Sequence, residues 1–100
     1  MVKISVMSAD KGTKTLWRIC MEGHAVGSEE ACAGCSAIIG ALAGMVENTA
    51  EKHSSIVRLE SGSAYVAAIC DEKLYGAFEM AYIGFLQIEA AYPDKIEVNK

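Results

Sequence analysis

Hydrophobic and polar residues alternate at the beginning of the chain, over residues 2–6. A period of two predicts a strand with one buried face. A cluster of turn-forming residues follows at 8–12, and residues 15–21 are rich in large and β-branched side chains. We therefore expect the second segment to pair with the first as a hairpin, which ends at Gly23 because glycine permits backbone conformations that other residues avoid.

A long stretch without charged residues, 31–46, indicates a helix. Ser28 is a good N-cap, and Glu29 and Glu30 complement the helix dipole in the first turn, so the helix is predicted to run from Ser28 to about Lys52. The uncharged run is shorter than the ~18–20 residues that span a bilayer. We interpret it as a buried helix of a protein that does not associate with a membrane, with His53 as a surface residue near its end.

Small residues gather on one face of this helix. The helix interior contains glycines, each of which costs about 1 kcal/mol relative to alanine. Close packing against another backbone would compensate that cost, so we expect either the second helix or a dimer partner to contact this face, which comprises Ala33, Ala37, Gly40, Ala41 and Gly44.

The second half of the chain repeats the hairpin-then-helix pattern. Residues 56–60 and 64–69 are predicted strands joined by a turn at Ser61 and Gly62, and Asp71 is the expected cap of a second helix. Pro93 should end that helix. Its apolar residues recur at spacings of three and four, typical of an amphipathic helix: Leu74, Phe78, Ala81, Phe85, Ile88 and Tyr92.

A short strand at 96–98 completes the order β-β-α-β-β-α-β. The pattern predicts an α+β fold, a two-layer sandwich in which two helices pack on a mixed β-sheet. The length of 100 residues corresponds to one domain, and a composition of 52% hydrophobic and 22% charged residues is typical of a globular protein.

Charge and cysteine content narrow the class of protein. The chain has a net charge of -4 and only nine Lys and Arg residues. A nucleic-acid-binding domain normally has a basic surface, so we do not expect this chain to bind nucleic acid. The N-terminus begins directly with a strand pattern and not with a signal peptide, so we expect a cytoplasmic protein whose four cysteines are free thiols. Cys20 and Cys70 lie in apolar stretches and are predicted to be small core residues.

Cys32 and His24 are the strongest candidates for chemistry. Cys32 falls in the first turn of the predicted helix, where the dipole favours a thiolate and free backbone N–H groups could stabilise an oxyanion. Glu29 and Glu30 oppose the thiolate because nearby anions raise a thiol pKa. The thiol therefore needs a basic partner, and His24, at the end of the preceding strand, could act as its general base.

Alternatives remain open at this point. Cys32 and Cys35 form a CxxC that could be a thiol-redox pair, and a non-enzymatic dimeric interaction domain is consistent with the small-residue face. Ser36 lies one turn after Cys32 and could hydrogen-bond in the site or to its own helix. A zinc site would need further ligand pairs, and the chain has no glycine-rich phosphate loop, so we expect no metal and no cofactor.

Two sequence segments resemble the ribosomal-processing cysteine protease (Prp) family. The first contains Gly23-His24-Ala25 and Gly27-x-Glu29-x-x-Cys32-Ala33-Gly34-x-Ser36-Ala37. The second includes Leu86, Gln87, Glu89, Tyr92, Ile96 and Asn99. The resemblance covers nearly the whole chain.

The resemblance implies a cytoplasmic bacterial endopeptidase that acts as a homodimer. Its expected substrate is the N-terminal extension of a large-ribosomal-subunit protein precursor, removed before ribosome assembly. By the same match His24 falls on the family's catalytic histidine and Cys32 on its nucleophile. Glu29 stands where the family usually carries aspartate, and Ser36 on the family's serine. The His24–Cys32 segment is about four residues shorter than the family's mobile loop.

Overall fold

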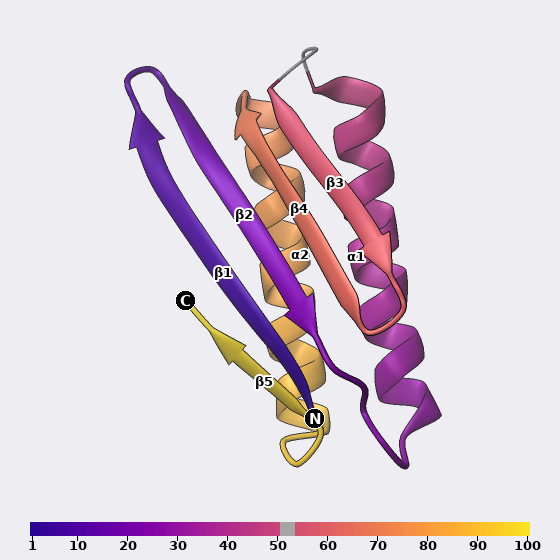
Figure 1. Cartoon of the computed structure of the whole chain (residues 1–100). Helices are drawn as coiled ribbons and strands as arrows, with labels where there is room; N and C mark the ends of the chain where they lie inside the picture. Colours follow the sequence, from indigo (N-terminus) through magenta and orange to yellow (C-terminus); the bar gives the residue numbers. More distant parts are fainter. Residues whose placement is uncertain (51–53) are drawn as a thin grey trace.

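The computed structural model describes residues 1–50 and 54–100, in the predicted order of strands and helices (Figure 1). The elements are β1 (Val2–Lys11), β2 (Lys14–Glu22), α1 (Glu29–Thr49), β3 (Ser55–Glu60), β4 (Ser63–Cys70), α2 (Glu72–Ala91) and β5 (Ile96–Asn99). The α+β prediction of two helices on a mixed sheet is confirmed.

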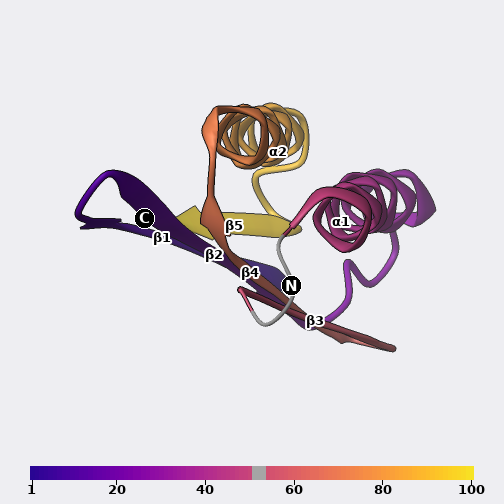
Figure 2. The ribbon, with the colours of Figure 1, turned by 90° about the horizontal axis from the view of Figure 1, so that it is seen from above.

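The five strands form one sheet in the order β3-β4-β2-β1-β5. The β1–β5 pair is parallel and the other pairs are antiparallel. Both helices lie on the same side of the sheet, and its other face is open (Figure 2). The sheet therefore buries one face only, as the alternation at the start of the chain predicts.

The core forms from alternate residues of neighbouring strands. Val6 of β1 lies opposite Ile19 of β2, which in turn lies opposite Val66 of β4. All three are buried, whereas Lys3 and Ser5 between the buried residues of β1 are exposed. This register places every second side chain against the helices.

The first hairpin extends further than predicted. The segment expected to turn, residues 8–10, belongs to β1, where Ala9 pairs with Leu16. The turn lies instead at Gly12 and Thr13, where Gly12 has a φ of 72°. A two-residue hairpin turn requires positive φ, which glycine supplies at little cost, so the chain reverses there and the polar residues before it remain in the strand.

Helix α1 begins as predicted and ends earlier. The Ser28 side chain accepts a hydrogen bond from the Ala31 N–H, and the helix ends at Thr49, before the predicted Lys52. Ala50 is the C-cap: its backbone is extended, and its N–H donates to the Val46 carbonyl at 2.9 Å, which satisfies one of the last carbonyls of the helix. The expectations for Lys52 and His53 themselves lie outside the described residues.

Most of the small-residue face of α1 does not pack against α2, although Ala41 lines the groove between the two helices. Ala33, Ala37 and Gly40 are exposed, and a Cβ placed on Gly40 or Gly44 would meet no atom within 4 Å. The helices instead approach each other through two other glycines. A Cβ at Gly34 would lie 3.0 Å from Ile88 Cδ1, and one at Gly84 would lie 2.9 Å from Ile38 Cδ1. Close packing by the second helix is therefore the wrong explanation for the predicted face.

The amphipathic pattern of α2 is confirmed. Leu74, Phe78, Ala81 and Phe85 are buried, and Ile88 and Tyr92 are partly buried against the core. In the part of the chain that the structure describes, α1 is the one helix long and apolar enough to cross a membrane, with a mean hydropathy of 1.3. It nevertheless contributes six residues to the core: Ala31, Cys35, Ile39, Leu42, Ala43 and Val46.

Candidate active site

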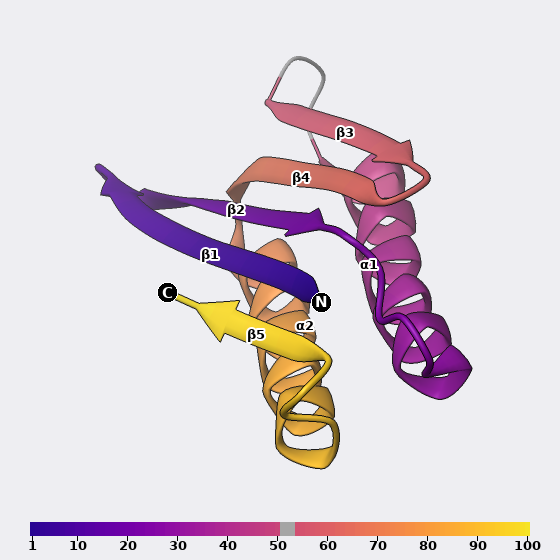
Figure 3. The same ribbon diagram turned by 60° about the horizontal axis from the view of Figure 1, so that its bottom comes forward.

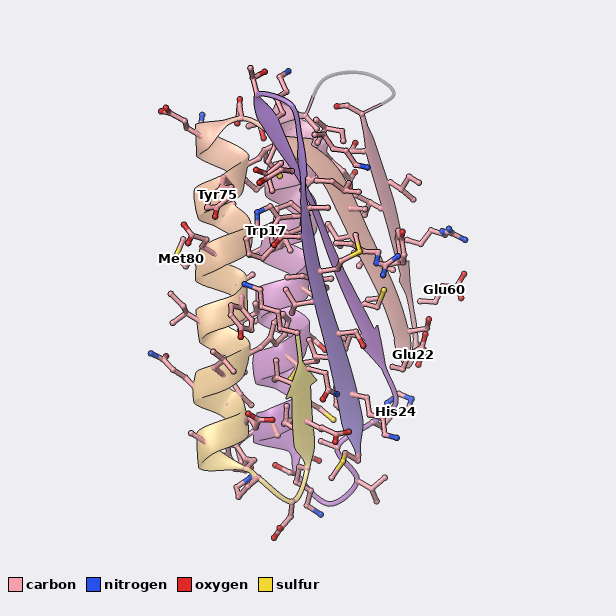
Figure 4. All side chains as sticks on the ribbon, turned by 90° about the vertical axis from the view of Figure 1, so that its left-hand side faces the viewer. Trp17, Glu22, His24, Glu60, Tyr75 and Met80 are labelled. Atoms are coloured by element: carbon pink, nitrogen blue, oxygen red, sulfur yellow. The ribbon has the colours of Figure 1, made fainter. Side chains whose placement is uncertain are left out.

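His24 follows β2 after one intervening residue, Gly23, at the end of the sheet where the β3–β4 turn is found (Figure 4). Gly23 ends the strand with a φ of 94°, and its N–H donates to the Gly62 carbonyl at 2.8 Å. A Cβ on Gly23 would overlap the Met1 carbonyl oxygen, so only glycine fits. The His24 imidazole rests against Gly62, where a Cβ would lie 2.7 Å from Nε2.

Cys32 is held at the start of α1 by the backbone of the preceding loop. Its Sγ accepts a hydrogen bond from the Ala25 N–H at 3.2 Å and lies 3.6 Å from the Ala25 carbonyl oxygen, to which a thiol can donate. An N–H directed at sulfur stabilises the thiolate, and a carbonyl stabilises the thiol. The buried Ala25 backbone therefore offers a partner to each protonation state of Cys32.

The side chains of His24 and Cys32 meet at one pocket. The pocket has a volume of about 180 Å³ and is lined by Val2, Met21, Gly23, His24, Cys32, Cys35, Ser36, Glu60, Ser61 and Gly62. The candidates Gly23 and Ser36 thus lie at the same site. Among the described contacts the Cys32 sulfur is hydrogen-bonded to Ala25 and not to His24, whose exposed imidazole rests against Gly62.

Gly27 and Glu29 lie outside this pocket. Glu29 is the first residue of α1 and is exposed. Gly27 belongs to the loop, has a φ of 83°, and lies beside Lys95, whose ammonium donates to the Val26 carbonyl at 2.6 Å. Lys95 thereby ties the loop to the segment before β5, and the loop in turn places the Ala25 amide against the sulfur.

The first-turn amides are less available than the sequence suggests. The Ala31 N–H donates to the Ser28 hydroxyl at 3.2 Å, and the Cys32 N–H donates to the Ser28 carbonyl at 3.3 Å. A strong N-cap uses these donors, so the expectation that they are free for an oxyanion is wrong for both. The amides of Glu29 and Glu30 are the donors of the first turn that the cap does not occupy.

The whole chain, apart from its last three residues, matches the model of one known protein family. The family model for the cysteine protease Prp matches residues 1–97. The chain belongs to this family.

Solved structures of low sequence identity share the fold. A Staphylococcus aureus ribosomal processing protease Prp with a covalently linked product peptide aligns with a TM-score of 0.80 and 19% identity, over 99% of this chain and 98% of that one. The same protease with a substrate peptide gives 0.79 and 19%, with the same coverage of 99% and 98%. A hypothetical protein from Staphylococcus aureus gives 0.72 and 16%, again over 99% and 98%. No curated protein matches the chain.

Cys35 and Cys70 are buried, whereas Cys32 is partly exposed. Desolvation, together with the charge of the neighbouring Cys32, raises the pKa of Cys35 from 9.0 to about 11. The pKa of Cys70 is also raised to about 11, chiefly by desolvation. Both therefore remain thiols at neutral pH, which disfavours Cys35 as an active redox partner. Cys20 is partly exposed on the open face of the sheet, so its prediction as a core residue is wrong.

The site residues that sequence reasoning missed belong to the β3–β4 turn. Glu60, Ser61 and Gly62 line the pocket, although they are far from Cys32 in the chain. The pairing of β2 with β4 brings them there, since Glu22 lies opposite Ser63. Ser61 and Gly62 predict a turn from their residue types. Those types do not predict that the turn lies against His24.

Replacing Gly62 with alanine should move the catalytic candidate His24. We expect kcat/KM for peptide cleavage to fall about 10–100-fold, because the new Cβ displaces the imidazole. The left-handed backbone adds a cost of about 1–2 kcal/mol in unfolding free energy. Gly12→Ala is the matched control, since Gly12 has a φ of 72° and no atom within 4 Å of its Cβ position. Equal activity of the two variants would show that Gly62 does not position His24.

Proposed function

We propose that this protein is a cysteine endopeptidase in which Cys32 is the nucleophile and His24 the general base. The carrying observation is that the two side chains line one pocket, with the Cys32 sulfur held by the Ala25 amide. Membership of the cysteine protease Prp family supports the assignment. The proposed roles belong to a thiol protease, in which an adjacent base activates sulfur.

In the proposed mechanism His24 takes the proton from Cys32, and the thiolate attacks the scissile carbonyl carbon. The imidazolium then gives that proton to the leaving amine, and the acyl-enzyme is hydrolysed by water that His24 activates. The Ala25 N–H stabilises the thiolate before attack. Ser36, at the pocket wall, offers a hydroxyl to the substrate, while Gly23, Ala25, Gly27 and Glu29 support the loop and the helix start.

The proposed substrate is the N-terminal extension of a large-ribosomal-subunit protein precursor, processed in the cytoplasm. The support comes from the relatives, because the Staphylococcus aureus protein is described as an essential ribosomal processing protease and binds a substrate peptide. The test is incubation of the protein with a peptide spanning such an extension, with products identified by mass spectrometry. Cleavage at one internal bond is expected, and an intact peptide would contradict the proposal.

We also propose a homodimer formed through the outer surface of the helices. A groove of about 420 Å³ lies between α1 and α2 and is lined mainly by apolar side chains, including Ile38, Ala41, Met45 and Met80. Met80 is 71% exposed and projects away from the sheet (Figure 4). Light scattering should give twice the chain mass for the wild type and for a control Glu47→Lys, and the single-chain mass for Ala41→Lys. A monomeric wild type would exclude this dimer.

A further inference from the structure

Strand β3 is the longer of the two sheet edges. The strand order ends at β3 on one side and at β5 on the other. β3 has six residues and β5 has four. Figure 3 shows β3 along the outside of the sheet, next to β4 and followed by no further strand. Its outer side is therefore open to another extended chain.

The hydrogen-bond pattern identifies the groups that this edge offers. The Ile69 N–H donates to the Ser54 carbonyl at 2.9 Å, and Ser55 lies opposite Ala68. In an antiparallel ladder the residues alternate between bonded and non-bonded pairs, so even-numbered residues of β3 direct their backbone groups towards β4. Val57 and Leu59 consequently direct their N–H and C=O groups outwards.

The same edge carries apolar side chains. Ile56 and Leu59 are each 50% exposed. Because they differ by three positions, they lie on opposite faces of the strand. Long edges with exposed apolar residues normally need protection against unwanted pairing. The charged Arg58 gives no such cover, since its guanidinium lies 5.4 Å from the Tyr65 ring centroid on the neighbouring strand.

The edge leads directly into the pocket of Cys32 and His24. Glu60 ends β3, and Glu60, Ser61 and Gly62 form one wall of that pocket. We propose that the substrate binds as an added strand on β3, paired through Val57 and Leu59, with its scissile bond delivered to Cys32. This inference rests on the proposed function and specifies its substrate as an extended segment with apolar residues that cover Ile56 and Leu59.

Leu59→Pro tests the pairing because proline lacks the N–H that faces outwards and leaves the ladder to β4 intact. Leu59→Ala is the control that loses the side chain and keeps the N–H. We expect kcat/KM for the precursor peptide to be about 10-fold lower for Leu59→Pro than for Leu59→Ala. Equal values would overturn the proposal while leaving peptide cleavage itself established.

A second measurement uses the wild-type protein and therefore does not depend on how the proline variant folds. Peptides N-methylated at successive positions should lose cleavage at every second position, because alternate amides pair with an edge strand. If the cleavage rate does not alternate with the N-methylated position, the strand-addition proposal is overturned, but the proposed peptidase function is not. A change from dimer to monomer in Leu59→Pro also overturns it, since the edge would then hold a second copy. No cleavage of any peptide by the wild type overturns the proposed function and this inference together.

Discussion

Replacing Cys32 with alanine should reduce kcat/KM for cleavage of the precursor peptide by more than about 10⁴-fold. The expected loss is large because, in the proposed mechanism, the Cys32 sulfur is the atom that forms the acyl-enzyme. Cys35 is the neighbouring thiol, but its pKa of about 11 leaves little thiolate at neutral pH. Product formation is measured by chromatography with mass detection.

Cys35→Ala is the matched comparison for this result. We expect it to retain cleavage within about 10-fold of the wild type, since a buried thiol there contributes packing and not nucleophilicity. A thiol-redox module would show the opposite pattern, in which loss of either cysteine abolishes activity. Undiminished cleavage by Cys32→Ala would refute the nucleophile assignment.

Replacing Phe78 with alanine should lower the unfolding free energy by about 3–5 kcal/mol. Phe78 is fully buried, and its ring stacks on Trp17 with centroids 5.9 Å apart. Trp17 is itself 2% exposed and meets Tyr75 edge-on at 5.4 Å. The truncation therefore opens a cavity where α2 packs on the sheet. A loss of this size is large against a typical domain stability of about 5–15 kcal/mol.

Glu79→Ala on the same helix is the control for this cavity. Glu79 is exposed and lies outside the groove between the helices, so the unfolding free energy should change by less than about 0.5 kcal/mol. Urea titrations monitored by circular dichroism measure both variants. Similar losses of unfolding free energy for the Phe78 and Glu79 variants would mean that α2 does not pack on the sheet through the face that contains Phe78.

Local signals account for the parts of the fold that the sequence predicts. Ser28 and Asp71 cap the two helices as expected, and the Asp71 carboxylate accepts from the Leu74 N–H at 2.9 Å. The length of β1 was not predictable in this way. Ala9 remains in the strand because it pairs with Leu16 across the hairpin, and that contact outweighs the turn propensity of its neighbours.

In the candidate site, too, contacts between residues close in sequence could be predicted, and contacts that depend on strand pairing could not. His24 and Cys32 are eight positions apart, so a strand end, a loop and a helix start suffice to predict that they lie near each other. Gly62 reaches the site only through the pairing of β2 with β4, which no local pattern reveals. The Ala25 amide points at the sulfur because of the loop's backbone path, and a residue type carries no information about that direction.

The most direct test of the account is the rate at which iodoacetamide alkylates Cys32 in the wild type and in His24→Ala. If the imidazole removes the thiol proton, the wild type should react about 10-fold faster than the variant at about pH 7, and the two rates should converge at about pH 10. Peptide mapping assigns the modified cysteine. Equal rates at every pH would contradict the pairing of His24 with Cys32.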